Sequence, residues 1–339
     1  MKRLRVGALA VALVVPMLVA SAPALTGGSS AAALTHVTYA YDFPGPDFEL
    51  IPVVVAQEKG FFAAHGISVK VVFPPNTSTT SAMLSTGAAN IGFVTTTDMG
   101  VAVNAGAPMV SVANYSMRNN WALFAKPGTS LRASTLHATL KGKRIFSYGD
   151  TWTESMLPYV LKYAGLTQSQ VKVVTDPTGN DLADLLAGKV DFATNTTNYE
   201  GPNFAGAHQS GHLSQILGTA VGAPNIPIWV YATSSSYATT HPGAVRAFLA
   251  AVKQATLWAV KNPAAAAGVF DMTYPKSGYS DAYNKLGWTL TIPFLTNASG
   301  QYFTQTDAQW RTLGASLTSV GLISKARAPS KYFTNSFLG

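Results

Sequence analysis

The hydrophobic and polar positions of the chain alternate between helical and strand-like patterns, most clearly in residues 51–73. Residues 51–59 predict a helix, with Pro52 in the first turn, where a missing N–H costs no hydrogen bond. Gly60 is a predicted helix C-cap, because glycine enters the left-handed region at little cost. Gly66 marks the next turn, and the apolar residues of 68–73 begin a buried strand. This order of elements is typical of an open α/β sheet.

The same alternation continues along the chain and divides into two runs at residues 126–130, where the composition changes. Strands are expected at 37–41, 68–73, 90–94 and 108–113 in the first run, and at 140–147, 171–174 and 190–194 in the second. Helices are expected at 77–86, 154–164, 180–187, 242–261, 283–295 and 306–320, with an alanine-rich helix after 263. We assign the helices after 242 to packing around the first run.

Two segments, 121–125 and 228–232, have the pattern of strands that cross between these runs. The sequence therefore predicts an α/β protein of two lobes, with a two-strand hinge, a cleft between the lobes and a helical C-terminal region. We expect lobe 1 to comprise residues 34–122 plus 229–339, and lobe 2 to comprise residues 123–228. Residues 1–33 are expected to be a signal peptide and linker.

The N-terminal segment has the pattern of an export signal. Basic residues 2–5 precede an apolar run, residues 6–20, and small residues follow it. The alternatives are a cleaved signal peptide and an uncleaved anchor helix. An apolar run of about 15 residues is shorter than the ~20 that a spanning helix needs, so we favour cleavage near Ala24 or Ala33. The predicted location is periplasmic or secreted.

The composition is that of a folded globular protein, with 47% hydrophobic and 11% charged residues. The net charge is +8, and removing the three bases of residues 1–33 leaves 20 basic against 15 acidic residues, or +5. No dense cluster of lysine and arginine is present, so we favour a mildly basic surface over nucleic-acid binding. The chain has no cysteine, which excludes disulfides, thiol catalysis and a lipid anchor at a cysteine.

Polar and aromatic residues follow the predicted strands at 42–49, 95–98, 148–154 and 195–200. Ligands of open α/β sheets lie beyond the carboxyl ends of the strands, so we expect these loops to line the cleft. The predicted ligand-binding residues are Asp42, Phe43, Thr95, Thr96, Asn120, Trp121, Tyr148, Thr151, Trp152, Asn195, Tyr199 and Glu200. The alternatives are loop packing for Phe43 and ordinary helix N-caps for the threonines, and we expect Thr151 or Thr153 to cap the helix that follows.

Common catalytic patterns are absent from the sequence. It contains no Gly-rich phosphate loop, no H-E-x-x-H and no G-x-S-x-G. Histidine, aspartate and glutamate do not cluster at the spacing of metal ligands. We therefore expect no cofactor, no metal and no enzymatic activity.

Residues 56–69, A-Q-E-K-G-F-F-x-x-x-G-I-x-V, resemble the signature of bacterial solute-binding proteins that serve ABC importers of thiamine precursors, sulfonates, taurine and nitrate. Further segments similar to this family follow in order at 84–94, 140–145, 185–192, 241–248 and 333–338. The resemblance implies a type II periplasmic-binding-protein fold and a monomer that captures a small molecule. It also implies ABC permease subunits in the membrane as partners.

The aromatic and amide-rich set of candidate residues favours a flat heterocycle such as a pyrimidine thiamine precursor. Members that bind thiamine precursors have an Asp-Trp-x-x-Asn-x-x-His type of stretch, whereas this chain has Asp42-Phe43 and no histidine there. The first alternative is a sulfonate, taurine or nitrate held at helix starts with Arg118. The others are a receptor for a sensor protein and a pyrimidine-forming enzyme. The resemblance to that enzyme branch would call for a cysteine-rich motif and a reactive histidine.

Overall fold

The computed structural model describes residues 33–207 and 213–339, of which Leu34–Gly339 form one compact unit. The predicted signal peptide and linker, except Ala33, lie outside the described residues. No helix within the described ranges is both long enough and apolar enough to cross a membrane.

The first sheet has the strand order β2-β1-β3-β10-β4. Its strands are β1 (Thr35–Tyr41), β2 (Ile67–Val72), β3 (Ile91–Thr95), β4 (Met109–Asn114) and β10 (Trp229–Ser234). β1 is parallel to β2 and β3, whereas β10 is antiparallel to β3 and β4. β3 is buried along its whole length, as expected for a central strand covered on both faces. The expected strands of the first run are thus confirmed within one or two residues.

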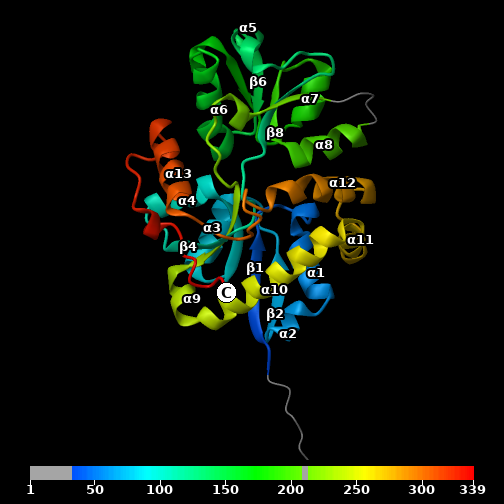
Figure 1. Cartoon of the computed structure of the whole chain (residues 1–339), viewed down its shortest axis with the longest axis vertical. Helices are drawn as coiled ribbons and strands as arrows, with labels where there is room; N and C mark the ends of the chain where they lie inside the picture. The colour runs from blue at the N-terminus through cyan, green and yellow to red at the C-terminus, as the bar shows by residue number, and fades with distance from the viewer. Residues whose placement is uncertain (1–32, 208–212) are drawn as a thin grey trace, which may run out of the picture. The chain divides into compact units, whose positions relative to one another are not determined.

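The second sheet repeats this arrangement. β8 (Ala193–Thr196), β5 (Trp121–Ala125) and β9 (Ser214–Leu217) form one antiparallel group, and β6 (Arg144–Ser147) pairs in parallel with β7 (Lys172–Thr175). The two groups are joined because the Phe146 N–H donates to the Phe192 carbonyl at 2.8 Å. The resulting order β7-β6-β8-β5-β9 matches that of the first sheet, with β5 in the place of β10. The fold is therefore mixed α/β and two-lobed (Figure 1).

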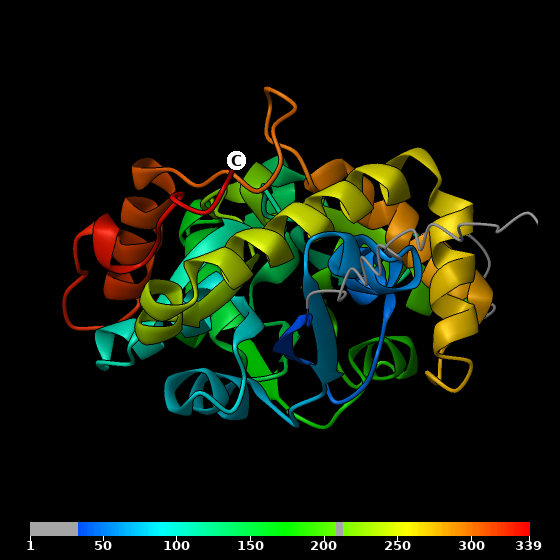
Figure 2. The ribbon, with the colours of Figure 1, turned by 90° about the horizontal axis from the view of Figure 1, so that it is seen from below.

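The helices cover both sheets (Figure 1). They are α1 (Ile51–Glu58), α2 (Phe61–Ala64), α3 (Thr77–Thr86), α4 (Thr96–Asn104), α5 (Leu136–Leu140), α6 (Thr151–Tyr163), α7 (Asp181–Ala187), α8 (Thr197–Gly206), α9 (Ser235–Thr240), α10 (Pro242–Lys261), α11 (Pro263–Thr273), α12 (Asp281–Thr291) and α13 (Asp307–Ser319). Figure 2 shows α10 as a long helix that runs across the first lobe. The ring centroid of its Phe248 lies 5.4 Å from that of Tyr39, and the same ring stacks on Phe62 of α2.

Several element boundaries follow the sequence closely, and others differ for a physical reason. Helices α3 and α10 have the predicted limits, and Gly60 has the left-handed φ of 70° predicted for it. Residues 195–200, expected to be a loop, instead form the end of β8 and the first turn of α8. Gly201 and Pro202 inside α8 hide its helical pattern, because both residues disfavour helix interiors.

The C-terminal helices reach further than predicted. α12 packs against α8 of the second lobe, and α13 packs against both α4 and α6. On α13, the Ser316 hydroxyl donates to the Ser155 carbonyl of α6 at 3.5 Å. These two helices therefore pack against the first lobe, as assigned, and also contact the second lobe, which was not expected. The exact lobe boundaries, 34–122 plus 229–339 and 123–228, stay a prediction.

Two helical glycines provide a matched test of this packing. A Cβ on Gly287 of α12 would lie 2.4 Å from the ring of buried Phe48, whereas a Cβ on Gly268 of α11 would meet no atom within 4 Å. We expect Gly287→Ala to lower the free energy of unfolding by about 1–3 kcal/mol, because the core must shift to admit the methyl group. Gly268→Ala should be neutral or stabilise by up to about 1 kcal/mol. Urea denaturation measures both, and equal effects would contradict the packing described.

Candidate functional site

The first turns of α4 and α6 meet between the lobes. Thr95 caps α4, since its hydroxyl accepts from the Asp98 N–H at 3.0 Å and donates to the Asp98 carboxylate at 2.6 Å. From α6, the Thr151 hydroxyl donates to the other Asp98 oxygen at 2.7 Å and lies 2.8 Å from the Thr97 hydroxyl. The predicted residues Thr95 and Thr151 thus lie in one hydrogen-bonded group, with Asp98 at its centre.

Helix α6 is capped by a residue other than the ones predicted. The Asp150 carboxylate accepts from the Thr153 N–H at 2.7 Å, so the expectation of a Thr151 or Thr153 cap is wrong. Aspartate is a stronger N-cap than threonine, and the helix begins three residues earlier than expected. Burial raises the pKa of Asp150, and repulsion from Asp98 adds to that shift. Each of the two facing helix starts therefore already has a carboxylate at its first turn.

Aromatic rings from both lobes form a second part of the site. The Phe43 ring centroid lies 6.0 Å from that of Tyr199 on α8 and 5.3 Å from that of Trp229 on β10. The Trp229 ring also stacks on Phe93 at 4.6 Å. The structure thus brings together the predicted residues Phe43 and Tyr199. Trp229 is absent from the prediction, although its place at the start of the crossing strand could have indicated it.

An amide and carboxyl cluster lies at the strand ends of the second lobe. The Asn195 amide donates to Asp181 at 3.1 Å and to Glu200 at 2.8 Å, and the Tyr148 hydroxyl donates to Asp181 at 2.9 Å. Glu200 is fully buried, and its Oε2 atom has no hydrogen-bond partner among the described residues. Burial raises the pKa of Glu200 well above its usual range, and the nearby Asp181 raises it further. Three predicted residues meet here around Asp181, which sequence reasoning missed.

A further pair of carboxyl groups, Asp47 and Glu49, lies where α8 meets the first lobe. The Tyr199 hydroxyl donates to Asp47 at 2.8 Å, and the Asn198 amide donates to Glu49 at 2.9 Å. The Tyr41 hydroxyl also donates to Asp47, at 2.5 Å. Burial raises the pKa of Asp47 to about 6, although its hydrogen bonds oppose the shift, and raises that of Glu49 well above its usual range. Both residues are absent from the prediction.

The remaining predicted residues have protein partners for their polar groups within the described ranges, except Trp152. Asp42 accepts from the Thr80 hydroxyl at 2.6 Å, Thr96 donates to the Pro227 carbonyl at 2.7 Å, and Asn120 donates to Asn198 at 2.8 Å. Trp121 is buried on β5, with its indole N–H 3.3 Å from the Thr153 hydroxyl. Trp152 is also buried, and its indole N–H has no partner among the described residues. Ligand contact stays a prediction for all twelve residues.

Arg118, the cation considered for an anionic ligand, is engaged elsewhere. Its guanidinium donates to the Pro293 carbonyl, and its charged end lies 5.5 Å from the ring centroid of Phe294. Within the described ranges, no group of three or more His, Cys, Asp or Glu residues could hold a metal ion.

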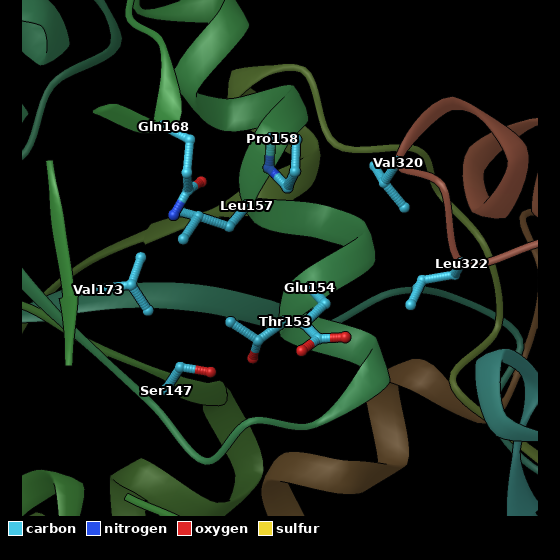
Figure 3. Close-up of a pocket in the computed structure, with 9 residues that line it drawn as sticks. All are labelled: Ser147, Thr153, Glu154, Leu157, Pro158, Gln168, Val173, Val320 and Leu322. Atoms are coloured by element: carbon cyan, nitrogen blue, oxygen red, sulfur yellow. The ribbon is translucent and has the colours of Figure 1, made fainter. Parts of the chain in front are cut away.

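A separate pocket of about 240 Å³ lies beside α6 (Figure 3). Thr153, Glu154 and Leu157 of α6 line it together with Val320 and Leu322 from the C-terminal segment. None of the twelve predicted residues is among those that line it. This pocket therefore shares Thr153 with the groups described above but contains none of the residues predicted to bind the ligand.

Comparison with known proteins adds a family and two relatives. A family model described as NMT1/THI5 like matches residues 47–266, which is more than half of the chain. A putative thiamine biosynthesis protein of Haemophilus influenzae is 25% identical over 287 residues, covering 83% of this chain and 86% of that protein. The formylaminopyrimidine-binding protein of Halalkalibacterium halodurans is 26% identical over 213 residues, which is 62% of each chain.

The fold is also similar to solved structures. The periplasmic aliphatic sulphonate binding protein SsuA of Escherichia coli superimposes with a TM-score of 0.68, covering 88% of this chain and 92% of that chain. The sequence identity is 16%, so this similarity concerns the periplasmic-binding-protein fold.

The Asp150 cap gives a direct test of how α6 begins. Asp150→Ala should lower the free energy of unfolding by about 1 kcal/mol, because the Thr153 N–H loses its acceptor. Asp150→Asn keeps an acceptor oxygen in the same place and should lose less. Urea denaturation of both variants at neutral pH measures the difference. Equal losses of unfolding free energy in the two variants would show that Asp150 does not stabilise the protein through this capping hydrogen bond.

Proposed function

The chain belongs to the NMT1/THI5-like family, and on this premise we propose that it is the extracytoplasmic substrate-binding component of an ABC importer. It captures a small organic molecule in the cleft between its lobes and delivers it to permease subunits in the membrane. It does so as a monomer and without catalysis. The two-lobed fold supports this role, because such folds close on ligands by hinge motion.

The ligand that fits the site best is a flat nitrogen heterocycle of the pyrimidine or thiamine-precursor class. The observation that carries this proposal is the buried acceptor set near the aromatic rings, above all the unpartnered Glu200 Oε2 beside Asn195. A buried carboxyl oxygen without a partner is costly, and the raised pKa of Glu200 allows this group to donate when protonated as well as to accept. A pyrimidine with an amino group beside a ring nitrogen offers a donor and an acceptor together, so it can pair with the carboxyl group in either form. Phe43, Tyr199 and Trp229 supply faces for stacking. The named function of the Halalkalibacterium relative agrees with this class.

A sulfonate, taurine or nitrate is the second candidate, because helix N-termini attract anions. In this chain the first turns of α4 and α6 already hold the carboxylates of Asp98 and Asp150, which would repel an anion. Arg118 is bound to the Pro293 carbonyl. We therefore place this candidate below the heterocycle.

Two other classes differ from a transport protein. A pyrimidine-forming enzyme would resemble the branch with a cysteine-rich motif, whereas this chain has no cysteine. A receptor for a sensor protein would share the same cleft but would associate with a sensor and not with a permease. Co-purification distinguishes the receptor from the importer component, because the receptor would bring down a sensor protein and the importer component would bring down permease subunits.

The location follows from the leader pattern. Residues 2–20 have the basic and apolar regions of a signal peptide, and the chain has no cysteine for a lipid anchor. We therefore propose that the protein is periplasmic or secreted. We also propose that its lobes have the boundaries predicted from the sequence.

A thermal-shift screen tests the proposed function. The mature protein is unfolded and refolded to remove any carried ligand, then mixed with thiamine-precursor pyrimidines, flavins, taurine, alkanesulfonates, nitrate and aromatic carboxylates. Ligand at about 100 times its Kd should stabilise the protein by about 2.7 kcal/mol, which is a shift of several degrees. We expect the shift with the pyrimidines. A thermal shift with the sulfonates alone would overturn the proposed ligand class. No shift with any compound would contradict the proposed ligand but would not affect the fold assignment.

Substitution of a cleft aromatic residue tests the site. Phe43→Ala should weaken binding of the pyrimidine found in the screen by about 2 kcal/mol, or roughly thirtyfold in Kd, because a stacking face is lost. Trp152→Ala should also weaken it. Tyr163→Ala is the control, since this ring is 51% exposed on the far part of α6. Isothermal titration calorimetry measures the three Kd values. Unchanged affinity in both Phe43→Ala and Trp152→Ala would place the ligand elsewhere.

A further inference from the structure

Helix α8 ties the second lobe to the first through two consecutive side chains. Tyr199 donates to Asp47 at 2.8 Å, and Asn198 donates to Glu49 at 2.9 Å and to the Thr291 hydroxyl of α12 at 3.0 Å. The Asn198 oxygen accepts from Asn120, which directly precedes β5. Separation of the lobes at α8 would break the bonds to Asp47, Glu49 and Thr291 together.

The carboxyl pair is buried with no opposite charge beside it. Asp47 is 2% exposed and Glu49 is 4% exposed, and neither takes part in an ion pair of the described residues. The titratable groups that interact with the pair are all acids or phenols. They are Tyr39 and Tyr41 on β1, Tyr115 directly after β4, Tyr199 on α8, Tyr231 on β10, Tyr279 just before α12, and Tyr283 on α12.

We propose that Asp47 and Glu49 form a proton-linked latch, which takes up protons when α8 closes onto the first lobe and releases them when the lobes separate. The latch rests on the two-lobed hinge of the proposed function, but it does not depend on which ligand is bound. It gives the closed and open forms different numbers of bound protons, so the external pH sets the balance between them.

The direction of the pH effect follows from the different environments of Asp47 and Glu49 in the closed and open forms. In the closed form, burial raises the pKa of Asp47 to about 6 and that of Glu49 further above its usual range. When α8 moves away, water reaches both groups and their pKa values return toward about 4. Below about pH 4 both forms are protonated and pH has no effect. As pH rises through the closed-state values, the closed form loses stability relative to the open form, by about tenfold per pH unit for each proton.

Small-angle X-ray scattering of the refolded, ligand-free protein from about pH 4.5 to about pH 8 tests the latch. We expect the radius of gyration to rise with pH as the closed form is lost. The double variant Asp47→Asn, Glu49→Gln keeps hydrogen-bond acceptors but cannot ionise, so it should stay compact across the range. Glu58→Gln, an exposed change on α1, is the matched control and should follow the unmodified protein. A radius that does not change with pH, or a change that persists in the double variant, would overturn the proposal.

Two single variants keep the test available if the double variant does not fold. Glu49→Gln removes one titrating group and should reduce the pH dependence. Tyr199→Phe removes a donor but leaves both carboxyl groups, so it should be more open at every pH while the pH dependence remains. An unchanged pH dependence in Glu49→Gln, together with a lost pH dependence in Tyr199→Phe, would contradict the latch. Because no ligand is used, a failed ligand screen leaves this result intact, and a flat scattering curve leaves ligand binding intact.

Discussion

The architecture depends on two strand crossings that lie against each other. β5 carries the chain into the second sheet, β10 returns it to the first, and each is the antiparallel strand of its sheet. The crossing segments are joined by hydrogen bonds, since the Ser116 hydroxyl accepts from the N–H groups of Ile228 and Trp229 at 3.0 and 3.1 Å. Each sheet is thus complete only with its crossing strand, so a hinge motion of the lobes would bend the chain at this junction.

A second constraint is electrostatic. Burying a carboxyl group without a cation is costly, and Asp47, Glu49 and Glu200 are all buried outside any ion pair of the described residues. Hydrogen bonds from tyrosine and asparagine offset part of this cost, and the raised pKa values of these three groups favour proton uptake, which offsets more. In the proposals above, the same property disfavours anionic ligands, favours ligands that pair with a carboxyl group, and makes closure sensitive to pH. One feature of the composition of the cleft therefore bears on both ligand class and conformational control.

Local signals explain what could be predicted from the sequence. The Asn76 cap and the Gly87 C-cap mark the ends of α3, and the apolar stripe of α10 has the helical period over its full length. The polar loops at strand ends identified Tyr148, Asn195 and Glu200, which do meet. Asp47 and Glu49 lie in a loop expected to line the cleft, but nothing local distinguishes them from the other polar residues of that loop. Their hydrogen bonds to Tyr199 and Asn198 come from α8, far away in the chain, and the helical pattern of α8 is hidden by Gly201 and Pro202.

In the proposed function, the first turn of α8 would link ligand recognition to closure. Tyr199 faces the first lobe through Asp47, whereas the next residue, Glu200, faces the second lobe through Asn195. Adjacent residues on one helical turn cannot move independently, so a shift of α8 that repositions Glu200 also changes the Tyr199–Asp47 distance. The Phe43 ring packs near Tyr199 and links the aromatic wall to the same turn. If a ligand binds at the strand ends as proposed, its contacts and the carboxyl pair of the first lobe are mechanically coupled through adjacent residues of one helical turn.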